Sequence, residues 1–95
     1  MVKQRSASVI ISALNEGARL AETIDSILSA RAVPTEIIVV DDGSADGCSE
    51  PLIGRQWRHT EVRVFRREHL GIAPARNFGA NMARLPFLVL SLIHI

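Results

Sequence analysis

Four short runs of apolar residues, each rich in β-branched or aromatic side chains, are spaced along the chain. They cover residues 8–14, 37–40, 62–65 and 87–90. In the first two runs the β-branched residues are contiguous, at 9–11 and 37–40, which is typical of strands that are buried on both faces of a parallel sheet. The pattern therefore predicts four short strands.

Two of the three intervening segments show helical periodicity. After the first strand, four apolar residues recur at helical spacing: Leu20, Ile24, Ile27 and Leu28. They predict a helix from near Glu16 to near Ala30, with Asn15 as its N-cap. After the third strand, a helix is predicted to begin near Pro74. Its expected buried stripe is Ala75, Phe78, Gly79, Met82 and Ala83.

The segment between the second and third strands carries a weaker helical signal. Pro51 suits a first helical turn. Gly54 interrupts the interior, and only Leu52, Ile53 and Trp57 offer an apolar face. We nevertheless expect a short helix here, because it completes the alternation of strands and helices.

This alternation predicts an α/β fold. The expected architecture is a Rossmann-like open parallel sheet with the element order βαβαβαβ and the strand order 3-2-1-4. That strand order places a topological switch between the first and fourth strands, and ligands bind at the carboxyl ends of the strands beside such a switch. The candidate positions are residues 12–16, residues 41–44 and whatever follows Leu90.

Composition limits the chain to one small domain. Its 95 residues are 47% hydrophobic, and the formal net charge of +1 gives no argument for a nucleic-acid partner. A single cysteine, Cys48, excludes an internal disulfide and fits a reducing compartment. The N-terminus lacks the apolar region of a signal peptide, and residues 85–95 are too short to span a bilayer, which needs about 20 residues.

Two adjacent acids, Asp41 and Asp42, follow the second strand directly, and Gly43 and Ser44 then supply turn chemistry. A buried strand therefore delivers two carboxylates to the edge where ligands bind. For Asp42, ligand binding is favoured over capping of the turn, because a turn cap does not need two adjacent acids. Asp41 is equally suited to a structural and to a ligand-facing role. Asp46 is expected to cap the following turn.

Three sequence blocks stand in a characteristic order: SVIISALNEG from Ser8, EIIVVDDGSADG from Glu36 and HLGIAPARNFGA from His69. Together they resemble the N-terminal half of family 2 glycosyltransferases. The resemblance implies the GT-A fold and a transferase that moves a sugar from a nucleotide-diphosphate donor to an acceptor. The donor implied by the family is a UDP-sugar.

The resemblance also implies which residues bind the nucleotide sugar. Asp42 matches the acid that holds the base, and a carboxylate can accept a hydrogen bond from the imide N–H of uracil. Arg76 matches an arginine that suits the donor diphosphate. For Glu16, a ligand contact and a favourable charge at a helix N-terminus are equally supported. The full set is Ser12, Ala13, Leu14, Glu16, Asp41, Asp42, Gly43, Ser44 and Arg76.

The chain departs from the family pattern in two places. Ser12 stands where the family usually has proline. After the fourth strand the family has an Asp-x-Asp motif that holds Mn²⁺ or Mg²⁺. Leu92, Ile93 and His94 stand there instead, and no carboxylate follows Glu68.

These departures predict that residues 1–95 are a single partial domain. We expect the nucleotide-sugar-binding half of a longer glycosyltransferase, with no catalytic residue, no metal ligand and no transferase activity of its own. Mn²⁺ or Mg²⁺ is expected only in the longer parent protein. Because the family pattern breaks abruptly at Ser91, our hypothesis is that residues 91–95 are a tail that is not native sequence.

Other interpretations stay open. A non-catalytic nucleotide-binding module would keep Asp42 and the first-strand loop without needing a metal. A receiver domain also pairs two acids, but it needs a third acid and a lysine after later strands, and the only lysine is Lys3. Classical dinucleotide binding is disfavoured, because no G-x-G-x-x-G follows the first strand. The parent is expected in the cytoplasm or on the cytoplasmic face of a membrane, since family members carry membrane segments elsewhere in their chains.

Overall fold

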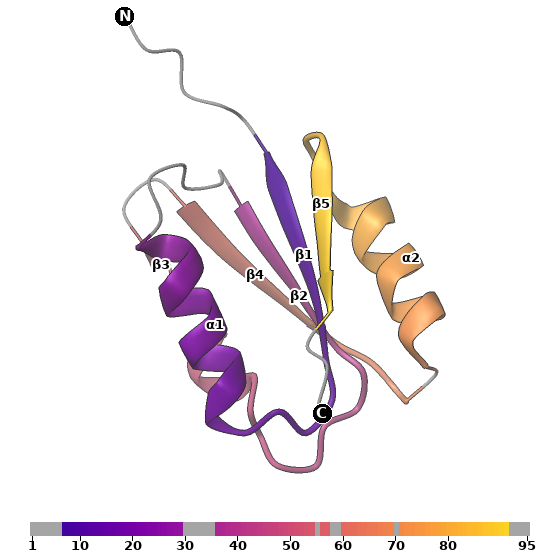
Figure 1. The fold of residues 1–95 in the computed structure, drawn as a ribbon. Helices are drawn as coiled ribbons and strands as arrows, with labels where there is room; N and C mark the ends of the chain where they lie inside the picture. The colour runs from indigo at the N-terminus through magenta and orange to yellow at the C-terminus, as the bar shows by residue number, and fades with distance from the viewer. Residues whose placement is uncertain (1–6, 30–35, 55, 58–59, 70, 92–95) are drawn as a thin grey trace, which may run out of the picture.

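The computed structural model describes residues 7–29, 36–54, 56–57, 60–69 and 71–91, which form a sheet with one helix on each face (Figure 1). Its elements are β1 (Ser8–Ala13), α1 (Ala18–Leu28), β2 (Glu36–Asp41), a 3₁₀ turn η1 (Glu50–Leu52), β3 (Gln56–Trp57), β4 (Thr60–Arg66), α2 (Ile72–Met82) and β5 (Phe87–Ser91). The predicted α/β class is therefore confirmed. No helix in the described part of the chain has the length and apolar character needed to cross a membrane.

The sheet has the strand order β3-β4-β2-β1-β5. β1 pairs in parallel with both β2 and β5, and β2 pairs in parallel with β4. The register places Ala13 opposite Asp41 and Asp41 opposite Arg66, so the strands end together at one edge. This carboxyl edge lies at the bottom of Figure 1.

The larger apolar core lies between the sheet and α1. Leu20, Ile24 and Leu28 of α1 are buried, as their spacing predicted. They pack on the β-branched side chains that the strands direct to this face: Val9, Ile11, Ile37, Val39 and Val62. Burial of these side chains, at roughly 1.5–3 kcal/mol each, supplies much of the driving force for folding.

The second core lies between the sheet and α2. Ile10, Ile38 and Val40 point to this face and contact Ala75, while Phe78 packs edge-on against Phe65 with ring centroids 5.3 Å apart. The predicted stripe of α2 is confirmed, because all five of its members lie on the sheet side of the helix: Ala75, Phe78, Gly79, Met82 and Ala83.

The prediction of a helix between the second and third strands is wrong. The described residues of this connection contain only the 3₁₀ turn η1 and the two-residue strand β3, which pairs antiparallel with β4 and makes the sheet mixed. Gly47 and Gly54 bracket η1 with φ angles of 70° and 75°. These left-handed backbone angles interrupt an α-helix on both sides, so no more than one tight turn forms.

A polar cluster closes the opposite, amino edge of the sheet. Glu36 is 1% exposed and accepts hydrogen bonds from the Ser8 hydroxyl at 2.6 Å and from the Arg63 guanidinium at 3.1 Å. Arg84 donates to it from its backbone N–H at 2.9 Å and from its side chain at 2.8 and 3.0 Å. Burial acts to raise the pKa of Glu36, but the bonds from Ser8, Arg84 and Arg63 outweigh it and lower that pKa to about 2.

Candidate functional site

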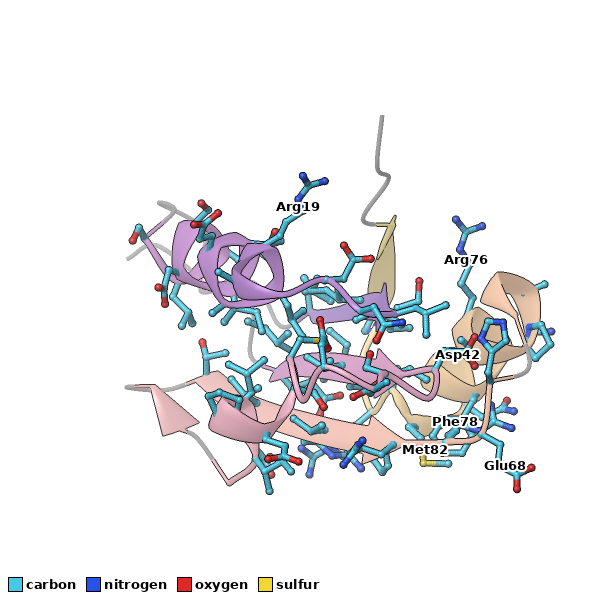
Figure 2. All side chains as sticks on the ribbon, turned by 90° about the horizontal axis from the view of Figure 1, so that it is seen from below. Arg19, Asp42, Glu68, Arg76, Phe78 and Met82 are labelled. Carbon is cyan, nitrogen blue, oxygen red and sulfur yellow. The ribbon has the colours of Figure 1, made fainter. Side chains whose placement is uncertain are left out.

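The predicted site residues gather at the carboxyl edge of the sheet. Figure 2 views the molecule from this edge and labels Asp42 and Arg76. Three connections meet here: β1 to α1, β2 to η1, and β4 to α2. All nine predicted residues lie in these connections or in the adjoining parts of β1, β2 and α2: Ser12, Ala13, Leu14, Glu16, Asp41, Asp42, Gly43, Ser44 and Arg76.

The end of β1 supplies backbone and one buried acid. Ser12 and Ala13 are buried, and the Ala13 carbonyl accepts a hydrogen bond from the Asp42 N–H at 2.9 Å. This bond extends the pairing of β1 with β2 one residue beyond the strands. Leu14 is half-buried, and Glu16 is only 8% exposed. The carboxylate of Glu16 is thus withdrawn from solvent, and its role toward a ligand stays a prediction.

Asp41 holds the loop that follows β2. Its side chain is fully buried, Oδ1 accepts the Ser44 N–H at 2.8 Å, and Oδ2 accepts the Ser49 hydroxyl. The Arg66 Nε lies 3.5 Å from the same Oδ2. Burial acts to raise the pKa of Asp41, but the hydrogen bonds from Ser49 and Ser44 and the charge of Arg66 lower it on balance. Of the two roles left open by the sequence, the contacts of Asp41 match the structural one.

Asp42 faces the start of α2. The residue is 5% exposed, and its Oδ2 accepts the Gly71 N–H at 2.9 Å. The His69 Nδ1 lies 3.0 Å from that oxygen and 3.2 Å from the Asp42 carbonyl oxygen. Asp42 therefore joins the loop after β2 to the N-terminus of α2.

Gly43 lets the loop after β2 lie in contact with the connection between β4 and α2. Its φ is 90°, and a Cβ at this position would lie 2.9 Å from the His69 backbone nitrogen and 3.2 Å from the Arg67 carbonyl oxygen. Only glycine combines this backbone angle with so little space. The predicted role of Gly43 in shaping the loop thus has a steric cause.

Ser44 and Asp46 tie the loop after β2 to the loop after β1. The Ser44 hydroxyl accepts the Asn15 N–H at 2.9 Å. Asp46 caps the following turn as predicted, since its Oδ1 accepts the Cys48 N–H at 3.0 Å. Its other oxygen accepts the Gly17 N–H at 2.9 Å. Partial desolvation acts to raise the pKa of Asp46, but the bonds from Cys48 and Gly17 lower it below the usual range.

The prediction that Asn15 caps α1 is wrong. The N-cap of α1 is Gly17, and no side chain caps this helix. The Asn15 amide oxygen instead accepts the N–H groups of Ala45 at 2.7 Å and Asp46 at 3.3 Å. An amide oxygen engaged with the loop after β2 is not available to the first turn of α1.

Arg76 lies in the first half of α2 and is exposed. In Figure 2 its side chain extends away from the ribbon, as does that of Arg19 on α1. Neither α1 nor α2 has an acidic residue in its first turn. Both helices thus begin at the carboxyl edge with their positive dipole ends, and the acids that face them come from the loop after β2, since Asp46 accepts the Gly17 N–H and Asp42 accepts the Gly71 N–H.

Within the described residues, no group of three or more His, Cys, Asp or Glu side chains is placed to hold a metal ion. The positions of the family's Asp-x-Asp motif, Leu92 to His94, lie outside the described residues, and their side chains are not oxygen ligands for Mn²⁺ or Mg²⁺. The residues present therefore do not fit this metal.

Two residues at this edge were missed by the sequence interpretation. The contact of the exposed His69 side chain with Asp42 was not predicted. Asn15 was assigned to the wrong partner. A signal for His69 was available, because it stands two residues before Gly71, where the connection from β4 reaches the same sheet edge. Asn15 gave no such signal, since its partners are 30 and 31 residues away.

Comparison with known proteins identifies the family of this chain. The family model described as Glycosyl transferase family 2 matches residues 8–91. This chain belongs to glycosyltransferase family 2. The family predicted from the three sequence blocks is thereby confirmed, and the matched range includes all nine candidate site residues of this glycosyltransferase chain.

Curated relatives carry the same family name. The chain is 33% identical over 84 residues to glycosyltransferase GlyG of Streptococcus pneumoniae, covering 87% of this chain and 28% of that protein. It is 34% identical over 77 residues to the uncharacterized glycosyltransferase EpsJ of Bacillus subtilis, covering 81% and 22%. It is 31% identical over 84 residues to a hyaluronan synthase of Pasteurella multocida, covering 85% and 8%. The chain thus spans less than a third of the length of these relatives.

Proposed function

We propose that this family 2 glycosyltransferase chain binds the nucleotide of a UDP-sugar and supplies the donor-binding part of a longer transferase. The observation that carries the proposal is the placement of Asp42. Its buried carboxylate stands at the carboxyl edge of the sheet, between the end of β1 and the N-terminus of α2. Ligands bind at this edge in open α/β sheets.

The chemistry of Asp42 suits a uracil base. The imide N–H of uracil donates a hydrogen bond. An ionised carboxylate can accept this bond and has no hydrogen of its own to donate. Because Asp42 is withdrawn from water, a hydrogen bond to it is electrostatically stronger than one to an exposed carboxylate. The Gly71 N–H holds Oδ2 in place at 2.9 Å and so preorganises the carboxylate.

Arg76 is the proposed partner of the donor diphosphate. It is exposed on the first half of α2, near the positive end of the helix dipole. Guanidinium groups suit phosphate oxygens, because their planar fork can donate two parallel hydrogen bonds. In this arrangement the base lies toward Asp42 and the diphosphate toward α2.

The chain by itself is proposed to be inactive in sugar transfer. No carboxylate follows Glu68, so the acids that hold Mn²⁺ or Mg²⁺ and activate the acceptor would come from other parts of the longer protein. The relatives do not indicate one acceptor, since they include a hyaluronan synthase and a cholesterol galactosyltransferase of Borreliella burgdorferi. We place the longer protein in the cytoplasm or on the cytoplasmic face of a membrane, and one cysteine in the chain fits that reducing location.

Titration calorimetry with UDP on the wild-type chain and on Asp42→Asn tests this function. Asn keeps the shape of the side chain but lacks its charge, and we expect affinity to fall by about tenfold or more, as for loss of a charge-assisted hydrogen bond. Asp25→Asn, on the exposed face of α1, is the matched control and should leave affinity unchanged. Equal UDP affinity of Asp42→Asn and wild type would remove the base-binding role.

The same titration with and without Mn²⁺ tests the proposal for the metal. If the metal ligands lie elsewhere in the longer protein, UDP affinity of this chain should not change when Mn²⁺ is added. In a separate assay with a UDP-sugar, release or transfer of the sugar by the purified chain would contradict the proposed inactivity. Binding of UDP without transfer also fits a non-catalytic nucleotide-binding module, and activity of the longer protein would separate the two.

A further inference from the structure

Asn15 makes reciprocal hydrogen bonds between the two loops that border the proposed nucleotide site. Its backbone N–H donates to the Ser44 hydroxyl at 2.9 Å. Its side-chain oxygen accepts the N–H groups of Ala45 at 2.7 Å and Asp46 at 3.3 Å. In the fourth bond, the Asp46 carboxylate accepts the Gly17 N–H at 2.9 Å. We call this set of four bonds the loop clasp.

The backbone of Asn15 explains why this residue type stands here. Its φ is 51°, and it is the only described residue other than glycine with a positive φ. Asparagine tolerates this left-handed angle better than most residues, because its short polar side chain bonds local backbone groups. In this chain the angle turns the backbone after β1 so that the N–H and the amide oxygen both face the loop after β2.

The clasp bears directly on Asp42. Residues 42–47 form the loop that carries this acid, and the Ala13 carbonyl holds its first N–H while Asn15 holds its middle. Without Asn15, the N–H groups of Ala45 and Asp46 lose their acceptor. The loop would then sample other conformations, and a ligand would have to order it at a cost in affinity.

We propose that Asn15 is a positioning residue for nucleotide binding. It sets the distance between the β1 backbone, residues 12–14, and the Asp42 carboxylate, so that base and nucleoside are met by a preformed site. This inference rests on the proposed UDP binding and adds to it a residue that touches no part of the nucleotide.

The test compares three variants of the full 95-residue chain by UDP calorimetry, thermal unfolding and amide hydrogen exchange. Asn15→Gly keeps the left-handed backbone but removes the acceptor, and we expect about a tenfold loss of UDP affinity and faster exchange at Ala45. Asn15→Asp keeps both the backbone tolerance and an acceptor oxygen, and should restore most of both. Ser8→Ala removes a hydrogen bond at the opposite, amino edge of the sheet, and controls for stability loss alone.

The outcomes distinguish a failure of the positioning role of Asn15 from a failure of the proposed UDP binding. Wild-type affinity in Asn15→Gly, together with lost affinity in Asp42→Asn, would overturn the positioning role and leave the proposed function intact. No UDP binding by wild type would overturn the proposed function and this inference with it. A loss of affinity in Ser8→Ala equal to that in Asn15→Gly would also overturn the inference, because stability alone would explain it.

Discussion

Gly79 of α2 and Ile10 of β1 meet so closely that a Cβ at Gly79 would lie 2.5 Å from the Ile10 Cγ2 atom. Alanine normally stabilises a helix relative to glycine by about 1 kcal/mol. Here we expect Gly79→Ala to lower the free energy of unfolding by about 1–3 kcal/mol, as overpacked cores do. Denaturant titration measures this, with exposed Asn81→Ala on the same helix as control. A gain in stability for Gly79→Ala would contradict the contact.

Gly43→Ala should be more damaging than the same change at Gly17. Both glycines have positive φ, 90° and 59° respectively, so each alanine pays for backbone strain. At Gly17 the added methyl meets nothing within 4 Å, whereas at Gly43 it meets the His69 backbone at 2.9 Å. We expect Gly43→Ala to cost at least about 1 kcal/mol more than Gly17→Ala in unfolding experiments. Equal costs would show that the loop moves aside freely.

Stability should fall in acid through Glu36. Its folded-state pKa of about 2 lies below the usual 4.5, so its contribution is fully present above pH 4.5 and is lost as the pH falls from there toward 2. The loss from this residue is at most about 3 kcal/mol. Urea titrations at pH 6 and pH 2.5 measure it, and Glu36→Gln should show a smaller difference between the two pH values than wild type.

Glu36→Gln is also expected to destabilise the chain at neutral pH. The Arg63 and Arg84 side chains, which are 23% and 57% exposed, would then face an uncharged amide, and the weaker hydrogen bonds to it should cost about 1–3 kcal/mol. If the stability of the variant and of wild type fell equally between pH 6 and pH 2.5, the acid transition would belong to other carboxylates. Asp41 is one candidate, since its pKa is also lowered.

Arg76→Ala should weaken binding of UDP more than binding of uridine, if α2 receives the diphosphate. Loss of one arginine–phosphate contact is expected to cost roughly tenfold in UDP affinity and to leave uridine affinity unchanged. Arg19→Ala on α1 is the matched control, because it also removes an exposed arginine from the start of a helix. Equal losses for UDP and uridine would indicate a role in the fold rather than in phosphate binding.

β1, β2 and both helices could be predicted because their signals are local. Contiguous β-branched residues mark β1 and β2, and Leu20, Ile24 and Leu28 recur at the period of α1. The connection after β2 was mispredicted because three apolar residues and a proline do not outweigh flanking glycines at left-handed angles. Local patterns were therefore sufficient to predict the fold class. The irregular connection after β2 could not be predicted without knowing its backbone angles.

The contacts within the candidate site could be predicted only in part. Asp42 and its neighbours were found because they follow a buried strand directly. The loop clasp joins residues about 30 positions apart, and Glu36 bonds Arg84 across 48 positions. Nothing in a single sequence specifies such pairs, because many acceptors and donors compete for each polar side chain and tertiary structure selects among them.

Buried acids at both ends of β2 restrict the strand to the length seen here. Glu36 meets Arg63 and Arg84 at one end, and Asp41 meets Ser44 and Arg66 at the other. An inserted or deleted residue between them would shift one carboxylate away from its cations and turn the intervening apolar side chains to the opposite face. Insertions and deletions in homologous chains should therefore fall in the connections outside residues 36–41 and spare the strand itself.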